Sequence, residues 1–186
     1  MVGNDMNAET PGKSDWVRAA VERHGGPLTR YAAQLTGNLD TARDVVQDTF
    51  LRLCQADPDR VQGHLAEWLF TVCRNRALDV LRKESRMTPL TEVDLAARPG
   101  DAPSPAVEAE RRETTSEVLR LLASLPPNQR EVVRLKFQNG LSYQEISRVT
   151  HLTVTNVGFL IHTAIRTLRQ KLQAPAFAPN SERRLS

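Results

Sequence analysis

Apolar residues recur at the spacing of an α-helix along most of the chain, and the apolar–polar alternation of a strand is sustained nowhere. The clearest helix is one that Asp40 is expected to cap, whose apolar side holds Ala42, Val45, Val46, Phe50, Leu53 and Cys54. Gly25-Gly26-Pro27 and Gly37-Asn38 interrupt the pattern before it, and Asp57-Pro58-Asp59 interrupts it afterwards. Residues 14–86 therefore predict a loop over 57–63 and helices over 14–24, 27–36, 40–54 and 65–84.

The helical pattern collapses after Met87, where several prolines lie among acidic residues. Because so long an irregular stretch is unusual inside one compact domain, residues 87–106 are interpreted as a flexible linker. The two ends of the chain, residues 1–13 and 174–186, are expected to be disordered.

Residues 107–173 carry a second helical pattern that ends in a helix-turn-helix signature. Asn139-Gly140 marks a helix stop, and Ser142 and Glu145 have the spacing of a capping box that opens a short helix. Thr150-His151-Leu152 reads as a turn, after which Thr153 caps a final amphipathic helix. The predicted fold is all-α, with two small helical domains over 14–86 and 107–173, the second a helix-turn-helix. An ordinary helical hairpin is the alternative.

Composition excludes several classes of protein. The 186 residues contain no apolar run long enough to cross a membrane, and the polar start, Met1 to Lys13, does not resemble a signal sequence. We therefore expect a cytoplasmic protein. Cys54 and Cys73 lack metal-ligand spacing and are expected to be small buried residues. No catalytic motif, cofactor motif or metal site is found, so the sequence argues against an enzyme.

Charge is distributed unevenly, because residues 114–186 hold ten Lys/Arg against four Asp/Glu. This imbalance indicates a polyanion as partner of the C-terminal part and favours a DNA-binding helix-turn-helix over a simple hairpin. The early polar face of its last helix would lie over base edges in the major groove. With the two capping residues, the expected DNA-binding set is Ser142, Thr153, Thr155, Asn156, Phe159, His162 and Arg166.

Three motifs resemble the extracytoplasmic-function (ECF) sigma factors. The stretches Leu125-Pro126-Pro127-Asn128-Gln129-Arg130-Glu131 and Gly140-Leu141-Ser142-Tyr143-Gln144-Glu145-Ile146 resemble their domain that reads the upstream (−35) promoter element. Response-regulator DNA-binding domains carry a similar pattern. Residues 31–53 and 68–82 separate the two families, because they resemble the polymerase-binding and promoter-melting helices of ECF sigma factors.

The resemblance implies a role for one face of each helix in the first domain. Opposite the apolar side of 40–54 lie residues expected to grip the clamp helices of the polymerase's largest subunit: Asp44, Gln47, Asp48 and Leu51. An exposed face of 65–84 that includes Phe70 is expected to melt the downstream (−10) element, through Arg74, Asn75, Asp79, Arg82 and Lys83. For both faces the alternative is plain solvation.

The last helix departs from the family, since Gly158-Phe159-Leu160 and Thr163 stand where members commonly carry Lys-Ser-Arg and Arg. Gly158 could allow close approach to DNA, and Phe159 could contact thymine methyls or instead pack on the first domain or another protein. The predicted function is an RNA polymerase sigma factor. Expected partners are core polymerase (clamp helices and flap), promoter DNA and an anti-sigma factor. A stand-alone regulator and a protein-binding adaptor are the alternatives.

Overall fold

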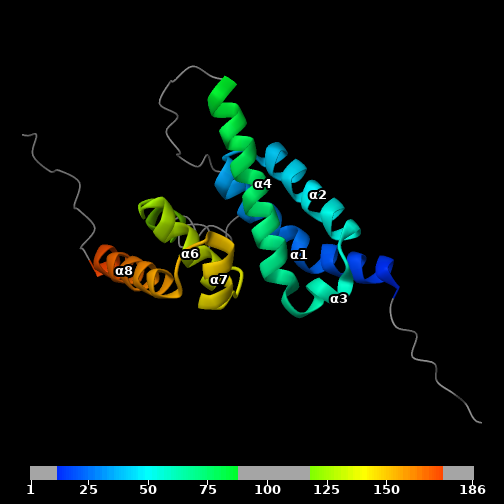
Figure 1. Ribbon diagram of the computed structural model, residues 1–186. Coiled ribbons are helices and arrows are strands. Elements are labelled where there is room, and N and C mark those ends of the chain that lie inside the picture. Colours follow the sequence, from blue (N-terminus) through cyan, green and yellow to red (C-terminus); the bar gives the residue numbers. More distant parts are fainter. Residues whose placement is uncertain (1–11, 88–117, 174–186) are drawn as a thin grey trace, which may run out of the picture.

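The computed structural model describes residues 12–87 and 118–173, and every regular element in these ranges is a helix (Figure 1). The elements are α1 (Lys13–Thr36), α2 (Leu39–Gln55), α3 (Pro58–Val61), a 3₁₀ helix η1 (Gln62–His64), α4 (Leu65–Met87), a helical segment over 118–123, α6 (Pro127–Phe137), α7 (Tyr143–Thr150) and α8 (Val154–Gln173). The all-α prediction with two helical domains is confirmed. We call residues 12–87 domain 1 and residues 118–173 domain 2.

The predicted linker and disordered ends lie outside the described residues, except at their edges. Lys13 begins α1 and Met87 ends α4, so these two residues are helical. Among the described helices, none combines the length and the apolar character needed to cross a membrane.

Domain 1 is a three-helix bundle in which α1, α2 and α4 pack against one another. Its core is built from aliphatic and aromatic side chains with almost no exposure, among them Leu28, Tyr31, Leu53, Leu69 and Phe70. Asn38, rather than the predicted Asp40, caps α2, because its side chain accepts hydrogen bonds from the backbone N–H groups of Asp40 and Thr41. Gly37 ends α1 in the left-handed conformation at φ 69°.

The predicted break at Gly25-Gly26-Pro27 is wrong, because α1 runs through it as one helix. Proline removes one backbone N–H, and the glycines weaken the helix further. The helix nevertheless continues because Leu28, next to the proline, is fully buried. In addition, the Thr29 hydroxyl donates a hydrogen bond of 2.8 Å to the carbonyl of Gly25. The tertiary contacts of Leu28 outweigh the local helix propensity. The predicted loop over 57–63 is also wrong: Asp57 caps α3 there, and η1 follows.

Domain 2 contains the predicted helix-turn-helix in α7 and α8. Ser142 and Glu145 form a complete capping box at the start of α7, as predicted. The helix ends at His151, whose φ of 59° is left-handed, and Thr153 then accepts a hydrogen bond from the N–H of Asn156 to open α8. The stop at Asn139-Gly140 is confirmed by Gly140 at φ 72° after α6.

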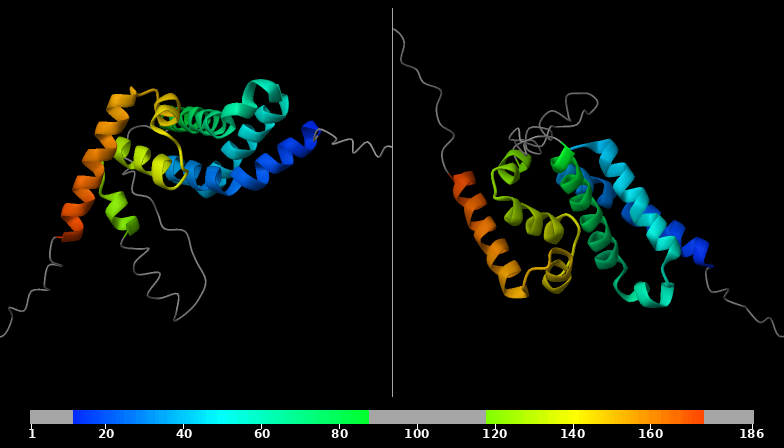
Figure 2. Two further views of the ribbon diagram at one scale, coloured as in Figure 1. Left: turned by 90° about the horizontal axis from the view of Figure 1, so that it is seen from below. Right: turned by 45° about the horizontal axis from the view of Figure 1, so that its top comes forward.

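The two domains touch each other. In Figure 2, α4 of domain 1 lies beside α7 of domain 2, and the contacts between these helices agree with that view. Buried residues of both domains join a single apolar cluster that includes Leu69 and Cys73 on one side and Ile146 and Val149 on the other.

Candidate polymerase and nucleic-acid interfaces

The face of α2 predicted to bind polymerase is open to solvent along most of its length. Asp44 and Gln47 are exposed, and Leu51 exposes 53% of its surface. Asp48 differs from its neighbours because its Oδ2 accepts a 2.6 Å hydrogen bond from Arg76 Nε of α4. Asp48 therefore ties α2 to α4 as well as facing outward.

The basic face of α4 is exposed in part. Asn75, Asp79, Arg82 and Lys83 are exposed, and Arg82 pairs with Asp79 at 3.2 Å one turn away. The prediction that Phe70 is exposed is wrong: only 2% of it is accessible, and its ring meets that of Tyr31 edge to face at 5.2 Å. The aromatic residue of this helix therefore belongs to the core.

All five residues of the predicted −10 set lie in the described part of the chain. Of these five, Arg74 alone is covered by domain 2. Its Nε and Nη2 donate to the two carboxylate oxygens of Glu131 on α6, at 2.8 and 3.3 Å. The hydroxyl of Tyr31 donates to the same carboxylate at 2.7 Å. Burial acts to lower the pKa of Arg74, but the hydrogen bond and charge of Glu131 outweigh it and raise the pKa. The pKa of Tyr31 is raised by burial and by Glu131.

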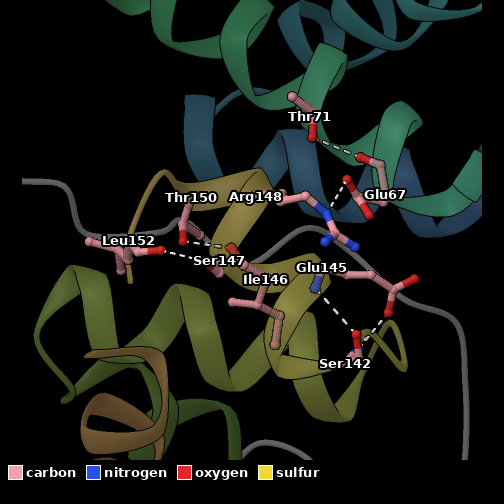
Figure 3. A network of polar contacts seen from close by, with 9 residues as sticks. All are labelled: Glu67, Thr71, Ser142, Glu145, Ile146, Ser147, Arg148, Thr150 and Leu152. Atoms are coloured by element: carbon pink, nitrogen blue, oxygen red, sulfur yellow. Dashed lines mark hydrogen bonds and ion pairs between the residues drawn. The ribbon is translucent and has the colours of Figure 1, made fainter. Parts of the chain in front are cut away.

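A second ion pair crosses between the domains at the first turn of α4, seven residues before Arg74 (Figure 3). Arg148 Nε of α7 donates to Glu67 Oε1 at 2.7 Å, and Glu67 is buried while Arg148 is exposed. Sequence analysis predicted neither of these contacts: it did not pair Glu131 with Tyr31 and Arg74, and it did not pair Arg148 with Glu67. Tyr31 and Glu131 stand in the quoted motifs, yet a single sequence carries no signal that pairs them across the two domains.

The predicted reading face of α8 lies on the surface of domain 2. Thr155, Asn156, His162 and Arg166 are exposed, opposite the buried stripe of Val157, Ile161 and Ala164. Phe159 exposes 66% of its surface, so it does not pack on domain 1 within the described part of the chain. The hydroxyl of Ser142 caps the N-terminus of α7, and the hydroxyl of Thr153 caps the N-terminus of α8. Both residues are exposed.

Gly158 faces the other helix of the helix-turn-helix. A Cβ at this position would lie 3.6 Å from Cε2 of the Tyr143 ring, an ordinary van der Waals distance. Tyr143 is held in turn by Lys136, whose Nζ lies 5.5 Å from the ring centroid. The side of α8 that carries Gly158 is therefore occupied by Tyr143.

The cysteines differ from each other, which corrects the prediction that both are buried. Cys54 is exposed, whereas Cys73 is buried, and burial raises the pKa of its thiol to about 12. Over residues 12–87 and 118–173, no group of three His, Cys, Asp or Glu side chains is arranged to hold a metal ion.

Two family models match the chain, one in each domain. Residues 20–87 match the family described as sigma-70 region 2, and residues 115–168 match the family described as sigma-70, region 4. The first match contains the α2 and α4 faces, and the second contains the helix-turn-helix.

Curated relatives align with both domains. The ECF RNA polymerase sigma factor SigL of Mycobacterium tuberculosis is 32% identical over 161 residues, which are 84% of this chain and 89% of SigL. SigE of Mycolicibacterium smegmatis is 31% identical over 82% of this chain, but the aligned part is only 60% of SigE. RpoE of Cereibacter sphaeroides is 30% identical over 72% of this chain and 71% of its own length.

Solved structures share the fold. CnrH, determined in complex with the cytosolic domain of CnrY, superposes with a TM-score of 0.60 at 27% identity, covering 89% of this chain and 92% of CnrH. The sigma factor RpoE of Bartonella quintana, determined with the anti-sigma factor NepR, superposes with a TM-score of 0.55 at 22% identity, covering 86% and 98%. The likeness to that RpoE shows the fold alone.

Proposed function

Since this chain belongs to the extracytoplasmic-function RNA polymerase sigma factors of the sigma-70 family, we propose that it directs promoter-specific initiation of transcription. Domain 1 docks on core polymerase and opens the −10 element, and domain 2 reads the −35 element. The observation that carries this proposal is the presence of both region 2 and region 4 in one chain, in that order. A stand-alone regulator is not favoured, because such a protein would not need region 2, which binds polymerase and melts the promoter.

Docking on polymerase would use the exposed face of α2. Leu51 offers an apolar anchor at 53% exposure, and Gln47 and Asp44 place an amide and an acidic group one and two turns before it on α2. Such a face suits a basic partner with an apolar groove, because the charges select the partner and burial of the leucine contributes affinity. We assign the clamp helices of the largest subunit as this partner and the flap as the partner of domain 2.

Promoter opening would use the exposed part of α4. Asn75 can hydrogen bond to the edge of an unpaired base, while Arg82 and Lys83 neutralise phosphates. Opening costs roughly 1.4 kcal/mol of stacking for each base-pair step, so contacts made only by the separated strand offset part of that cost. Asp79 lies among these groups and pairs with Arg82, which holds the guanidinium in place.

Reading of the −35 element would use the exposed beginning of α8, with Ser142 and Thr153 at the caps. Asn156 and Arg166 supply hydrogen-bond donors to bases and phosphates, and Phe159 supplies an apolar surface for thymine methyls. The exposure of Phe159 also leaves it free to meet another protein. In this proposal Thr155 and His162 contribute the remaining polar edge of the same face.

A protein that restrains the sigma factor belongs to the proposal as well. CnrH, which is 27% identical to this chain, was determined with the cytosolic domain of CnrY bound to it. RpoE of Bartonella quintana, which shares the fold, was determined with the anti-sigma factor NepR. From these two complexes we propose an anti-sigma factor as a partner of this chain, and we propose the cytoplasm as the place where the chain works. We assign this chain no catalytic role, because its proposed function consists of binding polymerase and DNA and separating the DNA strands.

The test is transcription from a promoter library by sigma-free core polymerase with and without the full chain, with transcript starts sequenced at low ionic strength. Defined start sites that depend on the chain support the proposal. No change in start sites at any salt concentration contradicts it.

Variants separate the two steps of domain 1. Asp44→Arg should weaken association with core polymerase, while Glu22→Arg, an equal charge change at an exposed position of α1, should not. Asn75→Ala should still associate but should open promoters poorly, measured by permanganate reactivity of unpaired thymines. If Asp44→Arg associates as well as Glu22→Arg, the α2 face is not the docking surface.

A further inference from the structure

One carboxylate of domain 2 contacts two helices of domain 1. Glu131, on α6, accepts hydrogen bonds from Tyr31 on α1 and from Arg74 on α4. The side chains of Arg74 and Glu131 are only 17% and 12% exposed. A charged pair so far removed from water is held only while both partners are present, because each alone would be a buried, uncompensated charge.

The carboxylate occupies the position at which Arg74 could hold a phosphate. A guanidinium binds a carboxylate and a phosphate in the same way, through two parallel N–H donors. Here Nε and Nη2, which form one such pair of donors on Arg74, are directed at Glu131. While this contact stands, Arg74 is not available to nucleic acid.

We propose that the Glu131–Arg74–Tyr31 contact is an internal latch, which keeps the two domains closed and masks Arg74 until the chain meets polymerase or DNA. The masking half of this proposal rests on the proposed function, since it assumes that Arg74 serves promoter opening. The closing half rests on the contacts alone.

The second ion pair strengthens the latch. Arg148 binds Glu67 on α4, seven residues and about two helical turns before Arg74 on nearly the same face of the helix (Figure 3). Helix α7 packs against α4. Glu67 is 7% exposed, and among residues 12–87 and 118–173 its Oε2 has no hydrogen-bond partner, so Arg148 provides its charge compensation. Domain 2 is thus held to α4 at two separated points, which resists both sliding and rotation.

Closure is measured in the full chain by double electron–electron resonance between spin labels on the two domains. Labels at Glu22→Cys on α1 and Gln170→Cys on α8 occupy exposed positions away from the contact. Cys54→Ser removes the exposed native thiol, and the buried Cys73 stays unlabelled. Glu131→Gln keeps the shape but removes the charge, and Arg148→Gln releases the second point without touching Arg74.

The matched control is Asp15→Asn. It changes net charge by the same amount as Glu131→Gln, but it alters an exposed pair with Arg18 within α1. We expect a narrow distance distribution for the parent and for Asp15→Asn. For Glu131→Gln and Arg148→Gln we expect a distribution that extends to longer distances, with the closed-to-open ratio lowered about tenfold.

The second measurement is binding of a fluorescent single-stranded oligonucleotide pool of random sequence to the same proteins. Tighter binding by both latch variants, together with longer distances, supports the proposal. Unchanged distances in both variants overturn it whatever the DNA result. Longer distances without tighter binding overturn the masking of Arg74. If Arg74→Gln in the opened Arg148→Gln background also leaves binding unchanged, then the assignment of Arg74 to DNA has failed, while the longer distances still support the closing contact.

Discussion

Arg76 Nε lies 2.6 Å from Asp48 Oδ2, so the face of α2 assigned to polymerase is tied to the helix assigned to promoter DNA. The two side chains are 30% and 41% exposed, which places the pair at the edge of the core rather than free in solvent. Asp48 therefore acts on the stability of domain 1 as well as on its surface.

Asp48→Arg should for this reason be a poor test of docking. It replaces the ion pair with two adjacent guanidinium groups, and we expect the free energy of unfolding to fall by about 1 kcal/mol. Urea denaturation followed by circular dichroism measures this loss. Asp44→Arg, at a solvated position one turn earlier, is the control and should unfold like the parent. Equal stability of the two variants would show that the Asp48–Arg76 pair contributes nothing.

Tyr31 should titrate abnormally. Its pKa is raised above the usual 10.0 by burial and then by the negative charge of Glu131. A raised pKa in the folded state means that the neutral phenol stabilises the fold fully below about pH 10, and that this stability is lost as the pH rises toward the folded-state pKa.

The two tyrosines of the chain make this measurable by phenolate absorbance. In Tyr143→Phe we expect phenolate to appear only when the domain opens or unfolds at alkaline pH. Tyr31→Phe is the control that lacks the buried phenol. Tyr31 ionising in Tyr143→Phe while circular dichroism stays native would contradict its burial against Glu131.

The capping box of α7 should make stability depend on acid. Hydrogen bonds from the Ser142 side chain and from its backbone N–H lower the pKa of Glu145 below its usual 4.5. Because this pKa is lowered by folding, the carboxylate stabilises α7 fully above about pH 4.5, and the contribution disappears as the pH falls through the folded-state value.

Ser142→Ala should therefore lower the free energy of unfolding at neutral pH by about 1 kcal/mol, the usual effect of removing an N-cap. The parent minus variant difference should shrink in acid, measured by urea denaturation at several pH values. Ser124→Ala, an exposed serine outside this box, is the control. A difference that stays constant down to the acid limit would show that Glu145 takes no part.

Sequence patterns predicted domain 2 better than domain 1, for a physical reason. In domain 2 the capping box at Ser142, the glycine stop at Gly140 and the turn before Thr153 act within a few residues, and these local signals were confirmed. Whether Pro27 interrupts α1 depends instead on what Leu28 packs against, and that partner surface comes from other helices. Periodicity also cannot show which residues of α4 domain 2 will cover.

The polar contacts between the domains were outside the reach of sequence reasoning for a related reason. Phe70 sits among basic residues and was assigned to the exposed face, but the ring of Tyr31 covers it. Glu131 was read as part of a family motif, and nothing local indicates that its carboxylate meets Arg74. The exposed members of the α2 and α8 faces, by contrast, follow from helical geometry alone.

Gly158→Ala should stabilise domain 2, although the glycine stands in the helix proposed to read DNA. Glycine in a helix interior costs about 1 kcal/mol relative to alanine, and the new Cβ would lie at an ordinary 3.6 Å from the Tyr143 ring. We therefore expect the free energy of unfolding to rise by roughly 0.5–1 kcal/mol. Gly140→Ala is the opposing control, because φ there is +72° and a side chain would be strained, so it should destabilise by a similar amount. Urea denaturation of the two variants decides the matter, and a destabilised Gly158→Ala would show that Tyr143 cannot accept even a methyl group on α8.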